Sequence, residues 1–323
     1  MEKIKFSKLN GQGNDFIIID SSKSEIKLPS KLISFMCERH FGIGADGLII
    51  VRNSKVADFM MDFYNHDGSR AEMCGNGIRC MARFIHDKKL QKNKLLKNSR
   101  IRIETMSGVK NVSLELIKNK KKTKIKNLEK TSSREKIIEN YPVINIKVDM
   151  GLPQFNKEKI PVNLNNNHEL NDKKLNNEFL MNYKLKINSL YFNINCVSMG
   201  NPHCVIFLDD NIDINTIPLS DWGPKIENNH IFPKKTNVEF IKVKNNTELV
   251  MRVWERGVGE TLACGTGACA SVVCAIKLEK IKSTKVKVSL PGGKLNIYWK
   301  NEKSPVYLEG EVSYIYDGEY FIN

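Results

Sequence analysis

The 323-residue chain has no apolar run of membrane-spanning length, so we expect no transmembrane helix and no membrane partner. The first ten residues, MEKIKFSKLN, alternate charged and apolar side chains, unlike a signal or transit peptide, and predict a cytoplasmic protein. Aromatic residues are scarce, and no RNA-binding motif accompanies the formal net charge of +15. Much of the lysine excess lies in residues 118–136, so we expect no nucleic-acid partner.

The 8 cysteines lack the spacings of a disulfide framework, and their close pairs lack the two-residue spacing of a zinc site. The chain also has no phosphate-binding loop and no obvious lysine for a pyridoxal cofactor. These absences favour reduced thiols, no metal and no cofactor.

The most informative motif is AEMCGNGIRC, at residues 71–80, in which Cys74 directly precedes Gly-Asn-Gly. Apolar residues follow at helical spacing, so the motif predicts a helix that begins just after Cys74. Free backbone N–H groups and the positive end of the helix dipole lie at such a position. They favour a carboxylate ligand and predict a lowered pKa for the thiol.

A second copy, TLACGTGACA at residues 261–270, places Cys264 before another Gly-x-Gly and another helical pattern. Asn14 precedes Cys74 by 60 positions, and Asn201 precedes Cys264 by 63, each asparagine directly after a glycine. The two halves therefore indicate an internal repeat of one α/β unit, with the two helix starts directed into a shared cleft. The alternative is a pair of glycine-rich helix caps that enclose buried structural cysteines.

Two thiols that approach one carbon from opposite sides can invert its configuration, because one removes a proton while the other delivers one. The two helix starts would stabilise the negative charge that develops on a neighbouring carboxylate. The motifs therefore predict a two-base racemase or epimerase.

Six motifs give the chain a close resemblance to the diaminopimelate epimerase family: NGQGNDF, RHFGIGADGL, FYNHDGSRAEMCGNGIRC, SMGNPHCVI, ERGVGETLACGTGACA and LPGGKL. The resemblance covers nearly the whole chain apart from two polar segments, 118–140 and 156–178, to which no role is assigned. It implies a cofactor-independent isomerase that interconverts LL- and meso-diaminopimelate, on the path to lysine and to peptidoglycan precursors. It also implies a homodimer, with Tyr316 at the dimer contact.

The resemblance further implies that Cys74 and Cys264 are the catalytic acid/base pair, tuned by His203 and Glu255 respectively. The implied substrate-binding residues are Asn14, Asn65, Gly75, Asn76, Asn201, Asn237, Glu255, Arg256, Gly265 and Thr266. Backbone N–H groups after each cysteine would hold the carboxylate at the reacting centre, and Arg256 is suited to binding a distal carboxylate.

The expected fold is α/β (α+β), with two pseudo-symmetric domains that are each a curved mixed sheet or barrel around a central helix. We place the N-terminal domain at residues 1–148, with 311–323 returning to it, and the C-terminal domain at 149–310. Two other functions stay open: a proline or hydroxyproline racemase-type epimerase of the same fold, and a basic non-catalytic binding protein.

Overall fold

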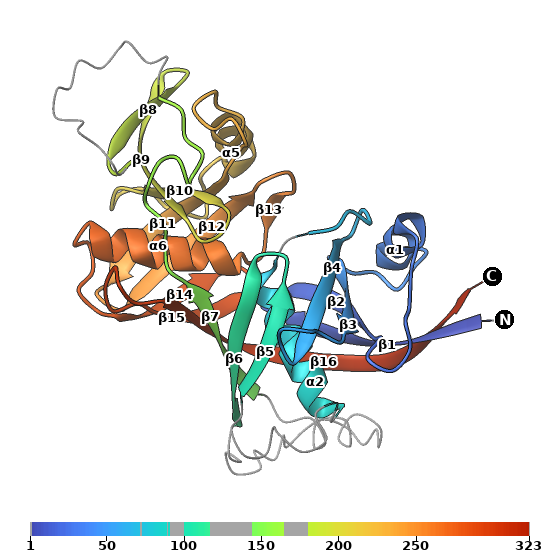
Figure 1. The fold of residues 1–323 in the computed structure, drawn as a ribbon. Helices are drawn as coiled ribbons and strands as arrows, with labels where there is room; N and C mark the ends of the chain where they lie inside the picture. Colours follow the sequence, from blue (N-terminus) through green and yellow to red (C-terminus); the bar gives the residue numbers. More distant parts are fainter. Residues whose placement is uncertain are drawn as a thin grey trace, which may run out of the picture. The chain divides into compact units, whose positions relative to one another are not determined.

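The computed structural model describes residues 2–71, 73–88, 90, 100–116, 144–164 and 180–322 (Figure 1). The predicted insertion 118–140 and the part of the second polar segment beyond residue 164 lie outside the described residues. The chain divides into two compact units, and each is considered by itself. Unit 1 comprises residues 1–148 and 309–323, and unit 2 comprises residues 149–308.

Unit 1 is a closed barrel of eight strands. Its strand order is β1-β2-β3-β4-β5-β6-β7-β16, and β1 pairs with β16 to close it. Figure 1 shows these two terminal strands side by side, in blue and red. The elements are β1 (Glu2–Gly11), β2 (Asn14–Asp20), α1 (Ser30–Cys37), β3 (Gly47–Arg52), β4 (Phe59–Asn65), α2 (Gly75–Asp87), β5 (Arg100–Thr105), β6 (Gly108–Leu116), β7 (Ile144–Gly151) and β16 (Val306–Ile322).

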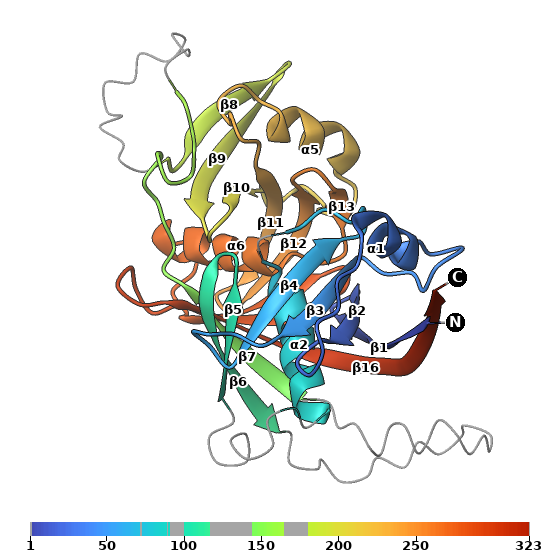
Figure 2. The same cartoon turned by 45° about the vertical axis from the view of Figure 1, so that its right-hand side comes forward.

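Unit 2 is a second mixed sheet, whose strands follow the order β8-β9-β10-β11-β12-β14-β15, with β13 paired to β12. The elements are β8 (Tyr183–Ile187), β9 (Leu190–Ser198), β10 (Pro202–Phe207), α5 (Leu219–Glu227), β11 (Asn237–Asn245), β12 (Glu248–Glu255), β13 (Gly259–Thr261), α6 (Gly265–Lys277), β14 (Lys285–Leu290) and β15 (Gly293–Tyr298). In Figure 2, α6 lies against the strands of this unit, and it packs on β9 to β12, β14 and β15.

The two units repeat one topology. In unit 1, β2 and β3 are parallel and are joined through α1, while β4 and β5 are parallel and are joined through α2. In unit 2, β10 and β11 are parallel through α5, and β12 and β14 are parallel through α6. This correspondence gives each residue near one cysteine a structural counterpart near the other.

The central helices are buried around almost their whole circumference, because the strands curve around them. Every residue of α2 from Gly75 to Ile85, and of α6 from Gly265 to Ala275, is buried. A helix enclosed on all sides needs small or apolar residues throughout, which the sequence of α6, GTGACASVVCAIK, provides. On the outer side of the sheets, α1 and α5 pack against two further apolar clusters, so the central strands are apolar on both faces.

The predicted fold class is confirmed: each unit is a curved mixed sheet, closed into a barrel in unit 1, around a central helix. The prediction missed α5, whose sequence LSDWGPKIE contains an internal glycine and proline. Within the part of the chain that the structure describes, no helix is long and apolar enough to cross a membrane.

Candidate functional site

In unit 1, Cys74 is the N-cap residue of α2, as the motif predicted. Its backbone is extended (φ −131°, ψ 122°), and its Sγ accepts a hydrogen bond from the N–H of Gly77 at 3.4 Å. The Nδ2 atom of Asn14 lies 4.0 Å from the same sulfur. A thiol held at a helix start by backbone N–H groups is in a position where a thiolate would be stabilised.

Asn14 begins β2, directly after Gly13, which has a positive φ of 83°. The buried Oδ1 atom of Asn14 has no hydrogen-bond partner among the described residues. A buried amide oxygen without a partner is unfavourable in the unliganded protein and is available to a ligand donor such as an ammonium group.

The fully buried guanidinium of Arg79 forms hydrogen bonds with the first turn of α2. Its guanidinium donates to the carbonyl oxygen of Gly75 at 2.9 Å and to Oδ1 of Asn76 at 2.8 Å, and it also bonds the side chain of Gln12. These contacts fix the two residues whose N–H groups the sequence predicted to bind a carboxylate. Asn65, the last residue of β4, donates from Nδ2 to Oγ of Ser69 at 3.0 Å and so lies in the turn that follows the strand.

In unit 2, Cys264 caps α6 with the same geometry. Its backbone is extended (φ −117°, ψ 114°), its Sγ accepts from the N–H of Gly267 at 3.4 Å, and Oγ1 of Thr266 lies 3.5 Å from the sulfur. Gly265 is the first residue of the helix. The predicted arrangement, a cysteine at the N-cap of a buried helix, therefore occurs once in each unit.

Repetition of the motif extends the expected lowering of the thiol pKa from Cys74 to Cys264, and for Cys264 this expectation is wrong. This residue is only 5% exposed, and burial raises the pKa of its thiol well above the ordinary value. The charges of Glu255 and Glu239 raise the pKa further, and the hydrogen bonds from Thr266 and Gly267 do not offset these effects. Cys264 is thus a thiol at neutral pH, suited to proton donation.

Glu255 ends β12 and lies beside Cys264. Its carboxylate accepts a hydrogen bond from Oγ1 of Thr261 at 2.5 Å and another from Cys264. Burial raises the pKa of the Glu255 carboxyl above its usual value, while these two hydrogen bonds oppose the shift. The arrangement agrees with the predicted pairing of this carboxylate with Cys264, in which it can receive or return the proton of the thiol.

His203 and Asn201 belong to a hydrogen-bonded group inside unit 2. The Nδ1 atom of His203 lies 2.6 Å from Oε1 of Glu239, and its Nε2 atom lies 2.9 Å from Oδ1 of Asn201. Asn201 in turn donates from Nδ2 to Oγ1 of Thr266 at 3.4 Å. These contacts connect His203 to Cys264, whereas the predicted pairing of His203 with Cys74 stays a prediction.

Asn237 and Arg256 have contrasting surroundings. Asn237 is buried, and its amide bonds the backbone at both ends: Nδ2 donates to the carbonyl of Pro202 at 2.8 Å, and Oδ1 accepts from the N–H of Arg256 at 3.0 Å. The guanidinium of Arg256 is exposed and donates to the carbonyl of Lys234 at 3.3 Å. Asn237 therefore orders the loop that carries Arg256, and the guanidinium stays accessible to a carboxylate.

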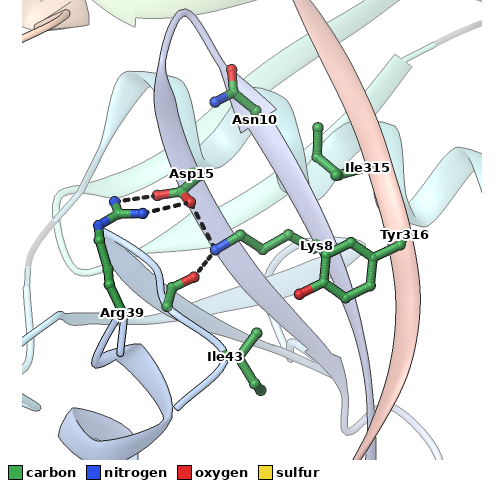
Figure 3. A pocket seen from close by; sticks show the side chains of 8 residues that line it. Lys8, Asn10, Asp15, Arg39, Ile43, Ile315 and Tyr316 are labelled. Carbon is green, nitrogen blue, oxygen red and sulfur yellow. Dashed lines mark hydrogen bonds and ion pairs between the residues drawn. The ribbon is translucent and has the colours of Figure 1, made fainter. Parts of the chain in front are cut away.

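Tyr316 lies on β16 at a pocket of about 330 Å³ in unit 1 (Figure 3). Two cations of this pocket share one carboxylate, since Lys8 lies 2.8 Å and Arg39 lies 2.9 Å from the carboxylate of Asp15. Burial raises the pKa of Asp15, but the hydrogen bonds from these two cations outweigh it and lower the pKa to about 2. The pocket is lined by Lys8, Asn10, Asp15, Arg39, Ile43, Gly44, Ile315 and Tyr316, and Tyr316 is the only predicted site residue among these.

Two buried charged residues near the cysteines were missed by the sequence reasoning, Arg79 and Glu239. Arg79 belongs to the CGNGIRC motif, but no role was predicted for it. Glu239 interrupts the apolar strand 238–241, and an acidic residue within a strand buried on both faces is a detectable signal. In the described part of the chain, no group of three or more His, Cys, Asp or Glu residues has the arrangement of a metal site.

Comparison with known proteins identifies close relatives of the chain. The family model of diaminopimelate epimerase matches residues 6–132 and 195–315. The diaminopimelate epimerase of Halothermothrix orenii is 44% identical, over 99% of both chains, and that of Methanococcus maripaludis strain C5 is 40% identical, over 98% of this chain and 99% of the relative.

The fold also resembles solved structures of distant sequence. A hydroxyproline epimerase from Agrobacterium vitis matches with a TM-score of 0.63 at 8% identity, covering 98% of this chain and 92% of that one. A phenazine biosynthesis protein of the PhzF family from Bacillus anthracis matches with a TM-score of 0.62 at 17% identity, covering 100% of both chains. At these identities the likeness establishes the fold alone.

Proposed function

Because the chain belongs to the diaminopimelate epimerase family, we propose that Cys74 and Cys264 carry the two proton transfers of the family's reaction. The chain is an isomerase, a diaminopimelate epimerase as its full-length relatives are named, and we expect it to interconvert the LL and meso forms. This reaction supplies the precursor of lysine. The assignment of residues to steps is our proposal.

The observation that carries the proposal is the duplicated cap. In each unit, a cysteine sulfur lies 3.4 Å from the N–H three residues further on, at the start of a buried helix. A structural cysteine needs no such cap, and the same cap in both halves of a repeat agrees with two thiols of equivalent chemistry. Inversion at one carbon requires two proton carriers that act on opposite faces.

The two thiols would transfer two protons in each turnover. With Cys74 as thiolate, its sulfur takes the α-proton, the C–H bond breaks, and the electron pair is delocalised into the substrate carboxylate. Cys264, which burial keeps protonated, then gives its S–H proton to the opposite face of the same carbon. Cys74 is then a thiol and Cys264 a thiolate, and the reverse reaction begins from this state: Cys264 takes the α-proton, and Cys74 gives its S–H proton to the opposite face. The hydrogen bond from Cys264 to Glu255 orients the S–H group of Cys264.

Backbone N–H groups of Gly75, Asn76, Gly265 and Thr266 would hold the reacting carboxylate, since the N-terminal N–H groups of a helix have no intrahelical acceptor. Developing negative charge on that carboxylate is then stabilised by groups that are already oriented. Asn14, Asn65, Asn201, Asn237 and Arg256 would bind the rest of the substrate. The unpaired Oδ1 of Asn14 supports this role for that residue.

The assembly and location of the protein are also proposals. We expect a cytoplasmic homodimer that requires no cofactor, with Tyr316 at the contact. This side chain is 42% exposed, and its neighbours Ile315 and Phe321 on β16 are exposed apolar residues as well. Tyr316→Asp should convert the dimer to a monomer in sedimentation equilibrium, and a variant that stays dimeric would place the contact elsewhere.

The test of function is isotope incorporation in deuterated water. Purified protein is given LL-diaminopimelate and, separately, L-proline, and deuterium at the α-carbon is measured by mass spectrometry together with the stereochemistry of the product. We expect deuterium and the meso isomer only from diaminopimelate. Exchange of proline alone would indicate a proline racemase-type activity, and no exchange with either would indicate a binding protein.

A further inference from the structure

A buried acid-imidazole pair lies behind the catalytic group of unit 2. Glu239 and His203 are both fully buried, and Oε1 of the carboxylate lies 2.6 Å from Nδ1 of the ring. The second carboxylate oxygen, Oε2, has no hydrogen-bond partner among the described residues. Burial of an incompletely paired carboxylate costs free energy of folding. Packing alone therefore does not explain why a glutamate occupies position 239.

The carboxylate lies directly against the first turn of α6. A Cβ atom at Gly267 would be only 2.6 Å from Oε1 of Glu239, so the glycine is what allows this approach. The positive end of the helix dipole stabilises a carboxylate at this place. The N–H of the same glycine donates to the sulfur of Cys264, so that Glu239 and the catalytic thiol contact one helix turn.

Unit 1 shows that the fold does not require the pair. Phe16 and His203 each lie two residues after the corresponding asparagine, and they pair with Gly47 and Asn237 on the next strand. Two residues along that strand, the counterpart of Glu239 is Ile49, whose Cδ1 would lie 3.2 Å from a Cβ at Gly77. One repeat therefore fills this space with a buried phenylalanine and isoleucine, and the other fills it with an ionisable pair.

The pair is connected to Cys264 through named hydrogen bonds. The Nε2 atom of His203 meets Oδ1 of Asn201 at 2.9 Å, Asn201 donates to Oγ1 of Thr266 at 3.4 Å, and that oxygen lies 3.5 Å from Sγ of Cys264. Rotation of the imidazole ring would break the bond to Asn201. Among the described residues, Glu239 is the partner of the other ring nitrogen, Nδ1.

We propose that Glu239 is a positioning residue for the epimerisation, which fixes the ring of His203 and thereby orders Asn201 and Thr266 beside Cys264. The inference rests on the proposed function, since it concerns the same reaction. Glu239 acts through His203 and need not contact the substrate. Its loss should therefore lower turnover and leave substrate affinity almost unchanged.

The experiment is a double-mutant cycle on turnover of LL-diaminopimelate, with Glu239→Gln, His203→Gln and the double variant. Loss of a hydrogen bond to a charged group predicts a fall in kcat of about 10- to 100-fold for Glu239→Gln, with KM nearly unchanged. The double variant should be no slower than His203→Gln alone, because one residue acts through the other. Glu248→Gln, which removes a carboxylate from surface ion pairs of the same unit, is the matched control and should keep wild-type turnover.

A spectroscopic measurement separates positioning from a purely structural role. The ring proton that His203 shares with a carboxylate at 2.6 Å should give a strongly deshielded, slowly exchanging imidazole N–H resonance. We expect this resonance to be absent in His203→Gln, which assigns it, and to move upfield in Glu239→Gln. If Glu239→Gln does not fold, the double variant His203→Phe, Glu239→Ile can be used, because it introduces the apolar residues found at the equivalent positions of unit 1. This variant should fold and should have severely reduced turnover.

Wild-type kcat in a folded Glu239 variant, or additive losses in the double variant, would overturn the inference. If the wild-type protein itself fails to epimerise diaminopimelate while the deshielded resonance is present, the proposed function fails instead. The two failures are therefore distinguishable.

Discussion

Replacing Gly267 by alanine places a methyl carbon 2.6 Å from Oε1 of Glu239 and 3.2 Å from its Cδ and Cγ atoms. To make room, Oε1 of Glu239 must move, and this is the atom that lies 2.6 Å from Nδ1 of His203. We therefore expect Gly267→Ala to break the 2.6 Å bond between Glu239 and His203.

The magnitude follows from three effects on the free energy of unfolding. Alanine in place of a helical glycine gains at most about 1 kcal/mol. Loss of a hydrogen bond to a charged group costs about 1.5–3 kcal/mol, and overpacking of a filled core costs a further ~1–3 kcal/mol. The net expectation is a destabilisation of about 1.5–5 kcal/mol.

The matched control is Gly77→Ala, at the same position after the cysteine in unit 1. Its added Cβ would meet Cε of Met61 at 3.0 Å and Cδ1 of Ile49 at 3.2 Å, and both are ends of flexible side chains that can shift. Urea denaturation followed by far-ultraviolet circular dichroism should show a lowered midpoint for Gly267→Ala and a midpoint close to wild type for Gly77→Ala. Equal midpoints for the two variants, or the reverse order, would refute the role given to the Glu239 carboxylate.

Three further predictions concern the thiols and the charges around them. Cys74→Ala and Cys264→Ala should each abolish epimerisation. The control Cys80→Ala, which removes a buried thiol of α2, should keep activity. Full turnover in Cys74→Ala or Cys264→Ala would exclude the two-thiol mechanism. Glu255→Gln should lower the pKa of Cys264, because it removes a negative charge that raises it, and alkylation of Cys264 followed by mass spectrometry should begin at lower pH than in the wild type. Asp15→Asn should destabilise unit 1 by about 2 kcal/mol above pH 4. Since the pKa of Asp15 is lowered from 3.8 to about 2, its contribution should be lost as the pH falls from about 4 to 2, and an unchanged difference between the two proteins at pH 2 would contradict this assignment.

The missed helix α5 shows where local sequence patterns are insufficient. Gly223 and Pro224 both weaken the helical pattern of LSDWGPKIE, so residue preferences argue against a helix. The glycine is required by packing, because a Cβ there would lie 2.5 Å from the ring of Trp254. The repeat itself contained the missing signal, because a helix between β2 and β3 in one unit implies a helix between β10 and β11 in the other, and this implication was not drawn.

Sequence alone determined those features that depend on local backbone chemistry. A cysteine followed by Gly-x-Gly and an apolar helical pattern predicts an N-capped helix wherever it occurs, and both Cys74 and Cys264 have that geometry. The order of motifs along the chain was also sufficient for the family and the fold class. The cap depends on adjacent residues and the family on the order of motifs, and both can be read without knowledge of the fold.

Only the tertiary structure decided the electrostatics of the thiol in unit 2. The raised pKa of Cys264 depends on how completely strands from distant parts of the chain exclude water, and on the two carboxylates that those strands bring beside the helix start. Glu239 and His203 are 36 residues apart and meet because β10 and β11 pair in parallel. Burial and the proximity of charges are properties of the packed chain. For this reason the helix cap at Cys264 predicts a lowered thiol pKa from the sequence, whereas the structure gives a raised one.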